Sequence, residues 1–298
     1  YMPELTKPDK PCLICGSETY NTDARQLMQK LESQSIDLIL TDPPYNLSPY
    51  STGNLNFTWR KNINNDLAEW DTKEFVPKDW VTEFKRVLKP TGNIFAFTSY
   101  NLLGKWHEAF DPEYDTFQYM VWHKTNPVPK VRRAGFLNSC ELIVCMWNKG
   151  HTWNFTTQKE MHNFIETPIC MGKERIKDPH HPTQKPIKVL EHIIKLASNE
   201  GDTVLDPFMG VGSAGVAAQK SHRNFIGIEI DEAYFNAAIK RMDSIQPNLS
   251  LLHLVSEDKG NGGVIPMPKV KGKMSFTKAA YEVLKVAKNP LSPNEIVN

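Results

Sequence analysis

The chain has 298 residues, of which 40% are hydrophobic and 23% are charged, and its formal net charge is +1. This composition is ordinary for a globular domain and excludes collagen-like and low-complexity chains. No apolar run approaches the roughly 18–20 residues that a membrane helix needs, and the first ten residues lack a secretory hydrophobic core. We therefore expect a cytoplasmic protein without membrane contact.

The charge is unevenly distributed along the chain. Residues 1–123 contain 12 basic and 17 acidic side chains, whereas residues 124–195 contain 12 and 6, and residues 259–288 contain 7 and 1. Basic stretches attract phosphate backbones, but solvated protein faces show the same excess. The charge distribution alone thus leaves both nucleic-acid binding and an ordinary surface open.

The five cysteines are scattered and odd in number, unlike a disulfide framework. Cys12 and Cys15 have the spacing of half a zinc knuckle, but no second pair completes such a site. Both lie in an expected strand over 11–15. We therefore expect buried or partly buried thiols there and no metal site.

Short apolar runs alternate with helical patterns along the rest of the chain. The first run ends at a double proline, and a helix over 77–88 and a turn at 89–92 precede the second. A helix of small residues over 213–220 separates the last two runs, and another helix follows over 232–245. The expected strands span 36–40, 93–97, 118–122, 141–147, 203–205 and 224–228. This alternation predicts a doubly wound α/β sheet with mostly parallel strands.

The sequence Thr-Asp-Pro-Pro-Tyr at 41–45 follows the first of these strands, at the edge where open α/β sheets bind ligands. Two prolines stiffen the loop, so Asp42 and Tyr45 would project from a rigid base. The Asp42 carboxylate and the Pro43 carbonyl can accept hydrogen bonds from an amino group, and Tyr45 offers a face for stacking on a planar base. The alternative is a proline-rich turn with a capping aspartate.

A glycine-rich turn occupies 205–215, LDPFMGVGSAG, between an expected strand and an expected helix. Such a turn brings backbone N–H groups and a helix N-terminus close to a ligand. Gly210 and Gly212 lack the third glycine of the dinucleotide fingerprint. Glu229 ends the next strand, where an acid holds ribose hydroxyls. NAD and S-adenosylmethionine both suit this arrangement, so the turn does not separate the two cofactors.

Together with HPTQKP at 181–186, these segments resemble the amino-group DNA methyltransferases that make N6-methyladenine or N4-methylcytosine. The resemblance covers about residues 12–247 and rests on DPPY, VWHKTN at 121–126, HPTQKP and DPFxGxG. The order, with the catalytic loop before the cofactor loop, is that of the circularly permuted β class. The resemblance implies a Rossmann-like class I methyltransferase fold, S-adenosylmethionine as cofactor and DNA as partner.

The resemblance also implies roles for individual residues. The catalytic loop would comprise Asp42, Pro43, Pro44 and Tyr45. The cofactor would be bound by Asp23, Thr183, Lys185, Asp206, Pro207, Phe208, Gly210, Gly212, Ser213 and Glu229. In this set Glu229 binds the ribose and Thr183 and Lys185 approach the cofactor carboxylate. HPTQKP also reads as a proline-initiated helix start, which does not exclude contact with the cofactor.

In the β class, the target-recognition region lies between the Trp-x-Lys strand and HPTxKP, here at about 148–180. DNA contacts are expected from Lys124, Lys130, Arg132, Arg133, Lys173, Arg175 and Lys177. The catalytic domain would span 1–258, followed by a Gly/Pro/Lys-rich linker over 259–273. Residues 274–298 resemble the start of a winged helix-turn-helix module called HARE-HTH. This segment is too short for a core of its own, so either the chain is truncated there or the segment packs on the catalytic domain.

These features predict a site-specific adenine-N6 DNA methyltransferase of a restriction–modification system, which flips its target base and methylates it directly. Three alternatives remain open: cytosine-N4 methylation, RNA or protein amide methylation, and a non-catalytic DNA-binding subunit. Carbon-5 cytosine methylation would require a Pro-Cys nucleophile loop, whereas Pro11-Cys12 opens a strand. A homodimer and a cognate restriction endonuclease are further expected partners.

Overall fold

The computed structural model describes residues 17–46, 74–129 and 135–245, which contain eight strands and six α-helices. The strands are β1 (Glu18–Asn21), β2 (Ile36–Thr41), β3 (Leu88–Thr98), β4 (Thr116–Lys124), β5 (Cys140–Trp147), β6 (Phe164–Thr167), β7 (Thr203–Asp206) and β8 (Asn224–Glu229). The helices are α1 (Ala24–Met28), α2 (Val81–Val87), α3 (Leu103–Phe110), α4 (Ile187–Ala197), α5 (Ser213–Lys220) and α6 (Glu232–Asp243), with 3-10 turns η3 (Pro77–Trp80) and η4 (Asp111–Glu113).

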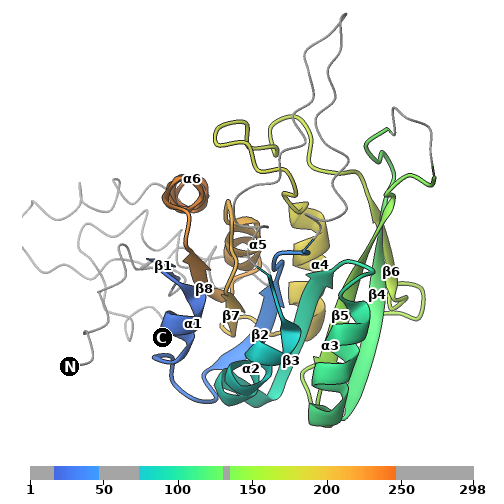
Figure 1. The fold of residues 1–298 in the computed structure, drawn as a ribbon, viewed down its shortest axis with the longest axis vertical. Coiled ribbons are helices and arrows are strands. Elements are labelled where there is room, and N and C mark those ends of the chain that lie inside the picture. Colours follow the sequence, from blue (N-terminus) through green and yellow to red (C-terminus); the bar gives the residue numbers. More distant parts are fainter. Residues whose placement is uncertain (1–16, 47–73, 130–134, 246–298) are drawn as a thin grey trace, which may run out of the picture. The chain divides into compact units, whose positions relative to one another are not determined.

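The strands form one sheet in the order β1-β8-β7-β2-β3-β5-β4-β6 (Figure 1). Only β5 runs antiparallel to its neighbours, β3 and β4, and the other pairs are parallel. The expected doubly wound, mostly parallel sheet is thus confirmed. This is the Rossmann-like arrangement that the sequence resemblance implies.

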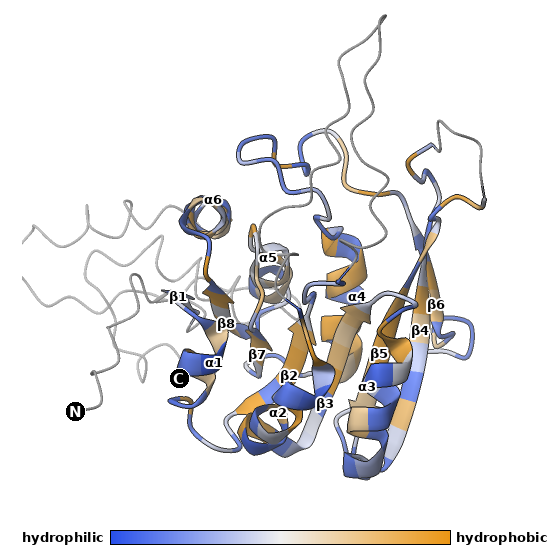
Figure 2. Ribbon diagram, in the orientation of Figure 1, coloured by the Kyte–Doolittle hydropathy of each residue, from blue (hydrophilic) through white to orange (hydrophobic). Residues whose placement is uncertain are grey.

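Helices cover both faces of the sheet because successive strand side chains point to opposite sides. Leu38 and Leu40 pack in a core with residues of α4, α5 and α6. Ile39 lies between them in sequence and packs in a second core with residues of α1, α2 and α3. The central strands are accordingly hydrophobic along most of their length, whereas the helices carry hydrophilic residues on their outer sides (Figure 2). A three-layer α/β/α domain results.

The turn expected at 89–92 lies inside β3, so this prediction was wrong. Ile36 of β2 pairs with Leu88, but Leu38 pairs with Asn93, and the additional residues of β3 form a bulge. A Cβ atom at Gly92 would lie 2.6 Å from Leu88 Cδ1, which shows how closely the bulge folds back on the strand. The Pro-Thr-Gly sequence therefore bends the strand without ending it.

The carboxyl ends of four neighbouring parallel strands bring distant segments to one edge of the sheet. Asn21, Thr41, Asp206 and Glu229 end β1, β2, β7 and β8, which are adjacent in the sheet. The DPPY loop and the glycine-rich turn therefore emerge side by side, although more than half of the chain separates them. Ligands bind at this edge in open α/β sheets.

Several predictions lie outside the described residues: the strand over 11–15, Lys130, Arg132 and Arg133, the linker and the segment that resembles a helix-turn-helix module. Within the part of the chain that the structure describes, no helix is both long enough and apolar enough to span a bilayer.

Candidate active site

Side-chain amides hold the DPPY loop in place after β2. Asn101 donates a hydrogen bond from its side chain to the Tyr45 carbonyl at 3.1 Å. The Asn46 side chain donates to the Phe75 carbonyl and accepts from the Phe75 N–H, both at 2.8 Å. Asn46 has a φ of 56°, a left-handed conformation that asparagine adopts more readily than most residues. These contacts fix the direction in which Asp42 and Tyr45 leave the strand.

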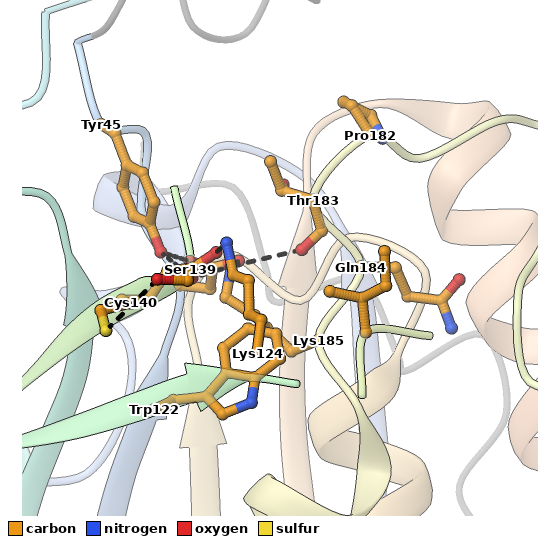
Figure 3. Close-up of polar contacts among 12 residues, drawn as sticks. Tyr45, Trp122, Lys124, Ser139, Cys140, Pro182, Thr183, Gln184 and Lys185 are labelled. Carbon is orange, nitrogen blue, oxygen red and sulfur yellow. Dashed lines mark hydrogen bonds and ion pairs between the residues drawn. The ribbon is translucent and has the colours of Figure 1, made fainter. Parts of the chain in front are cut away.

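Asp42 belongs to a cluster of four charged side chains, Asp42, Glu141, Lys124 and Lys185, which we call the charged cluster. The Lys185 ammonium donates to Asp42 Oδ2 at 2.5 Å and lies 3.3 Å from Glu141 Oε2. Lys124 Nζ contacts the other oxygen of Glu141 at 2.6 Å. The Tyr45 hydroxyl donates to Asp42 Oδ1 at 2.7 Å. Figure 3 shows Tyr45, Lys124 and Lys185 converging on one point from three segments of the chain.

The charged cluster sets the protonation of its members. Burial alone would raise the pKa of Glu141, but Lys185 and Lys124 outweigh it and the pKa is lowered. Burial would lower the pKa of Lys185, but Asp42 and Glu141 outweigh it and the pKa is raised. For Asp42, burial raises the pKa against the opposing effect of Lys185, and the charge of Glu141 raises it further. Glu141 and Lys185 are therefore firmly charged, whereas the ionised state of Asp42 depends on its lysine.

Two further acids, Asp206 in the glycine-rich turn and Glu229 at the end of β8, are held by neutral donors. Asp206 Oδ1 accepts hydrogen bonds from Thr41 Oγ1 at 2.9 Å and from the Phe208 N–H at 3.0 Å. Glu229 Oε2 accepts from the Gly210 N–H at 2.9 Å. Burial raises the pKa of Asp206 to about 7 and also raises the pKa of Glu229. Among the described residues, neither carboxylate forms a salt bridge.

HPTQKP packs directly against the glycine-rich turn. Gly210 has a φ of +52°, and a Cβ atom there would lie 2.8 Å from His181 Nε2. Gly212 has a φ of +75°, and a Cβ atom there would lie 2.9 Å from Ala238 Cβ of α6. Both glycines thus combine a left-handed backbone with a space that a side chain would fill. The structure brings together the DPPY loop, the glycine-rich turn and HPTQKP, as the sequence predicts.

Other predicted cofactor residues have structural partners at the same edge. Asp23 caps α1 by accepting hydrogen bonds from the Arg25 and Gln26 N–H groups at 2.9 and 3.3 Å. It lies near Glu229, because the N–H of the preceding residue donates to the Glu229 carbonyl at 3.1 Å. Phe208 packs edge-on against Trp80, with ring centroids 4.9 Å apart.

Three further predicted residues belong to HPTQKP or to the glycine-rich turn. The Thr183 carbonyl accepts a hydrogen bond from Lys185 at 3.2 Å. The buried Ser213 begins α5, and its hydroxyl accepts from Arg241 of α6 at 2.9 Å. Pro207 is buried directly after Asp206. These contacts neither require nor prevent a role in cofactor binding, which remains a prediction.

Hydrogen bonds connect part of the expected recognition region to HPTQKP. The Gln184 side chain donates to the Glu174 carbonyl at 2.7 Å and accepts from the Ile176 N–H at 2.9 Å. Lys173, Arg175 and Lys177 line an open pocket of about 680 Å³ in the same segment, together with Met171 and Gly172. Lys124, by contrast, is in the charged cluster and is half-buried.

The sequence did not single out Glu141, Asn46 or Asn101. Glu141 begins an apolar strand, and its two lysine partners are distant in the sequence. Asn46 directly follows DPPY, and an asparagine after such a turn is a recognisable signal for a left-handed residue. Asn101 has no signal of its own, because its partner is a backbone carbonyl.

The family described as DNA methylase matches residues 36–240, well over half of the chain. The chain belongs to the amino-group DNA methylases. It is 33% identical over 294 residues to the type II methyltransferase M.HinfI of Haemophilus influenzae, covering 92% of this chain and 79% of that one. S-adenosylmethionine is the methyl donor of this methylase.

Solved structures of related methylases share the fold. The structure of an M1.HpyAVI–SAM complex is 26% identical, with a TM-score of 0.54 over 75% of this methylase and 98% of that chain. The PvuII DNA methyltransferase, described as cytosine-N4-specific, is 18% identical, with a TM-score of 0.58 over 78% and 87% of the two chains. The second likeness concerns the fold alone.

Proposed function

We propose that this methylase transfers a methyl group to the N6 amino group of adenine within a specific DNA sequence. One observation chiefly supports methyl transfer to an amino group. The Thr41 hydroxyl, at the end of β2, donates to Asp206 at the end of β7, so Asp42 directly follows a residue bonded to the glycine-rich turn. A group that can accept from an amino donor thus lies beside the expected cofactor loop.

Asp206 and Glu229 fit S-adenosylmethionine, which supplies an electrophilic methyl group when it is bound. That molecule carries positive charge on its sulfonium and ammonium groups. Asp206 is buried and Glu229 is half-buried, and neither carboxylate has a cationic partner among the described side chains, so a cationic ligand would be stabilised there. In this proposal Asp206, Phe208 and Gly210 hold the methionine half, Glu229 the ribose and Asp23 the adenine, with Thr183, Pro207, Gly212 and Ser213 around them.

Asp42 and Tyr45 perform different tasks in the transfer. An exocyclic amino nitrogen is a weak nucleophile because its lone pair is delocalised into the ring. Hydrogen bonds from this amino group to Asp42 and to the Pro43 carbonyl favour a tetrahedral nitrogen with an available lone pair. Each carboxylate oxygen accepts more than one hydrogen bond, so Asp42 can accept the amino group while Tyr45 and Lys185 hold it.

The target base must leave the duplex to reach this loop, which costs a few kcal/mol. Stacking on Tyr45 contributes roughly 1–3 kcal/mol in the opposite direction. Lys173, Arg175 and Lys177 line an open pocket, and in this proposal they contact DNA phosphates. The proposal also places the enzyme in the cytoplasm beside its DNA, with a homodimer and a cognate restriction endonuclease as partners.

A single experiment tests the reaction and the target base. Unmethylated DNA is incubated with the protein and tritiated S-adenosylmethionine, then digested to nucleosides that are identified by mass spectrometry. We expect N6-methyladenine, with Asp42→Ala as the inactive control. N4-methylcytosine would instead support the second candidate, since the DPPY motif suits the amino group of either base. No incorporation of tritium would indicate a non-catalytic DNA-binding subunit.

A further inference from the structure

The ammonium group of Lys185 has three hydrogen-bond donors, and each has an acceptor. It donates to Asp42 Oδ2 at 2.5 Å and to the Thr183 carbonyl at 3.2 Å, and Glu141 Oε2 lies 3.3 Å away. A lysine has no further donor to offer. The Lys185 side chain is only 4% exposed, so these partners also replace its water. This lysine is therefore fully engaged within the protein before any ligand binds.

Glu141 holds this arrangement together. One of its oxygens contacts Lys185 and the other contacts Lys124, at 3.3 and 2.6 Å. The same acid lies 3.3 Å from the Tyr45 hydroxyl, which also donates to Asp42. With two lysines and two carboxylates, the cluster carries no net charge. Glu141 thus links the two residues of the catalytic loop to two separate lysines.

We propose that Lys185, held in place by Glu141, is a positioning residue for Asp42. It keeps the Asp42 carboxylate ionised and directed at the amino group of the target base, instead of binding the carboxylate of the cofactor. This inference rests on the proposed function, because it assumes that Asp42 accepts a hydrogen bond from that amino group.

The surroundings of Asp42 explain why it needs a cation. The groups that face it are Lys185, Glu141, Tyr45 and, from β7, Asp206. Burial and the negative charge of Glu141 favour protonation of Asp42, and Lys185 is the cation that opposes them. A protonated Asp42 would carry no negative charge to attract the amino hydrogens. Without Lys185, the carboxylate would therefore lose its function at a higher pH than in the wild type.

The decisive variant is Lys185→Met, measured by single-turnover methylation at saturating cofactor and DNA across a pH range. We expect the rate to fall on the order of 100-fold, as for a misplaced reacting group. We also expect the acidic limb of the pH–rate profile to move to higher pH. The Kd of S-adenosylmethionine, measured by calorimetry, should stay near the wild-type value. Lys185→Arg keeps the positive charge and should return the acidic limb toward its wild-type position.

Two further variants separate position from charge. Glu141→Gln removes a like charge from Asp42 while loosening Lys185, so the rate should fall without a shift of the acidic limb to higher pH. Asp37→Asn is the matched control, because Asp37 pairs with Lys89 at 2.8 Å at the opposite end of β2. This control should lose stability and keep both the rate and the pH profile.

Specific results would overturn the inference. A wild-type rate and pH profile in Lys185→Met would overturn it. A large rise in the cofactor Kd of this variant, with an unchanged rate at saturation, would also overturn it and would assign Lys185 to cofactor binding. If Lys185→Met does not fold, a wild-type rate in Glu141→Gln overturns the inference instead. The two levels are distinguishable: if the wild type transfers no methyl group to DNA, the proposed function itself fails. Methylation that stops in Asp42→Ala but continues at the wild-type rate and pH profile in Lys185→Met overturns only the positioning role.

Discussion

Two pairs of buried or partly buried acids lie at the same edge of the sheet, but the groups that hold the two pairs differ in charge. In the charged cluster, Asp42 and Glu141 are held by lysines. Asp206 in the glycine-rich turn and Glu229 at the end of β8 are held by a hydroxyl and by backbone N–H groups. The pKa of Glu141 is lowered as a result, whereas burial raises the pKa of Asp206 to about 7.

The difference shows how one edge can serve two ligands of unlike charge. A cluster without net charge suits a neutral base, since it offers a carboxylate as acceptor without attracting cations. Buried carboxylates without a cationic partner create a negative potential that suits a positively charged ligand. A hydrogen bond from Thr41 to Asp206 joins the two sites, so they stay adjacent while differing in electrostatics.

The largest expected effect is that of Asp42→Ala on the rate. Loss of the carboxylate removes the acceptor for the amino group, and the single-turnover rate should fall about 1,000-fold. Cofactor and DNA affinities should change much less, because neither depends on this acceptor. A parallel loss of cofactor and DNA affinity would show that the charged cluster supports binding. The functional difference proposed between the two sites would then be wrong.

Asp206→Ala should act on binding, where Asp42→Ala does not. We expect S-adenosylmethionine binding to fall below detection in calorimetry while the circular dichroism spectrum stays native. In the wild type, the affinity should weaken as the pH falls through about 7, because Asp206 takes up a proton there. Asp206→Asn should abolish this pH dependence. Unchanged cofactor affinity in Asp206→Ala would remove the glycine-rich turn from the cofactor site.

Tyr45→Ala should weaken capture of the extruded base by the roughly 1–3 kcal/mol of a lost stacking contact. Tyr45→Phe and Tyr45→Trp keep an aromatic face and should retain much of the capture. The fluorescence of 2-aminopurine at the target position reports the step, since it rises when the base leaves the stack. If Tyr45→Ala captures and methylates like the wild type, neither the ring nor the hydroxyl of Tyr45 is needed for the reaction.

Ionised Asp206 should also lower the stability of the folded protein at neutral pH. The folded-state pKa of Asp206 is raised above its ordinary value of 3.8, so its effect on stability becomes less favourable as the pH rises from about 4 to about 7. Asp206→Asn should therefore unfold at a higher temperature than the wild type at pH 8, and the gap should narrow toward pH 4. An Asp206→Asn variant less stable than the wild type at pH 8 would contradict this.

The smallest effect should come from the recognition region, which lies outside both acid pairs. Neutralising Lys173, Arg175 and Lys177 together should flatten the log–log dependence of DNA affinity on salt, because fewer counterions are released. The same change at the exposed Lys78, Lys85 and Lys105 is the control and should leave the slope unaltered. An unchanged slope in the first variant would assign those three residues to a solvated face.

The sequence predicts the framework of the site better than its electrostatics. Asp42 and Asp206 each follow a short apolar run, so their positions at the end of a strand can be read directly. Glu141 could not be found in this way, because its partners Lys124 and Lys185 become neighbours only when β4 pairs with β5 and HPTQKP folds over both. The bulge at 89–92 was missed because Pro-Thr-Gly signals a turn equally well within a strand and between strands. The four-residue β6 is too short to show a period.

The sheet order has a consequence for the order of synthesis. β1 and β2 leave the ribosome first, but β8 and β7 lie between them in the finished sheet. The strands β1 and β2 must therefore leave space between them for two strands, or stay unpaired, until β7 and β8 have been made. A nascent chain that has not yet reached Asp206 carries the DPPY loop without β7, the neighbouring strand that ends at Asp206. The hydrogen bond from Thr41 to Asp206 can therefore form only after β7 has been made.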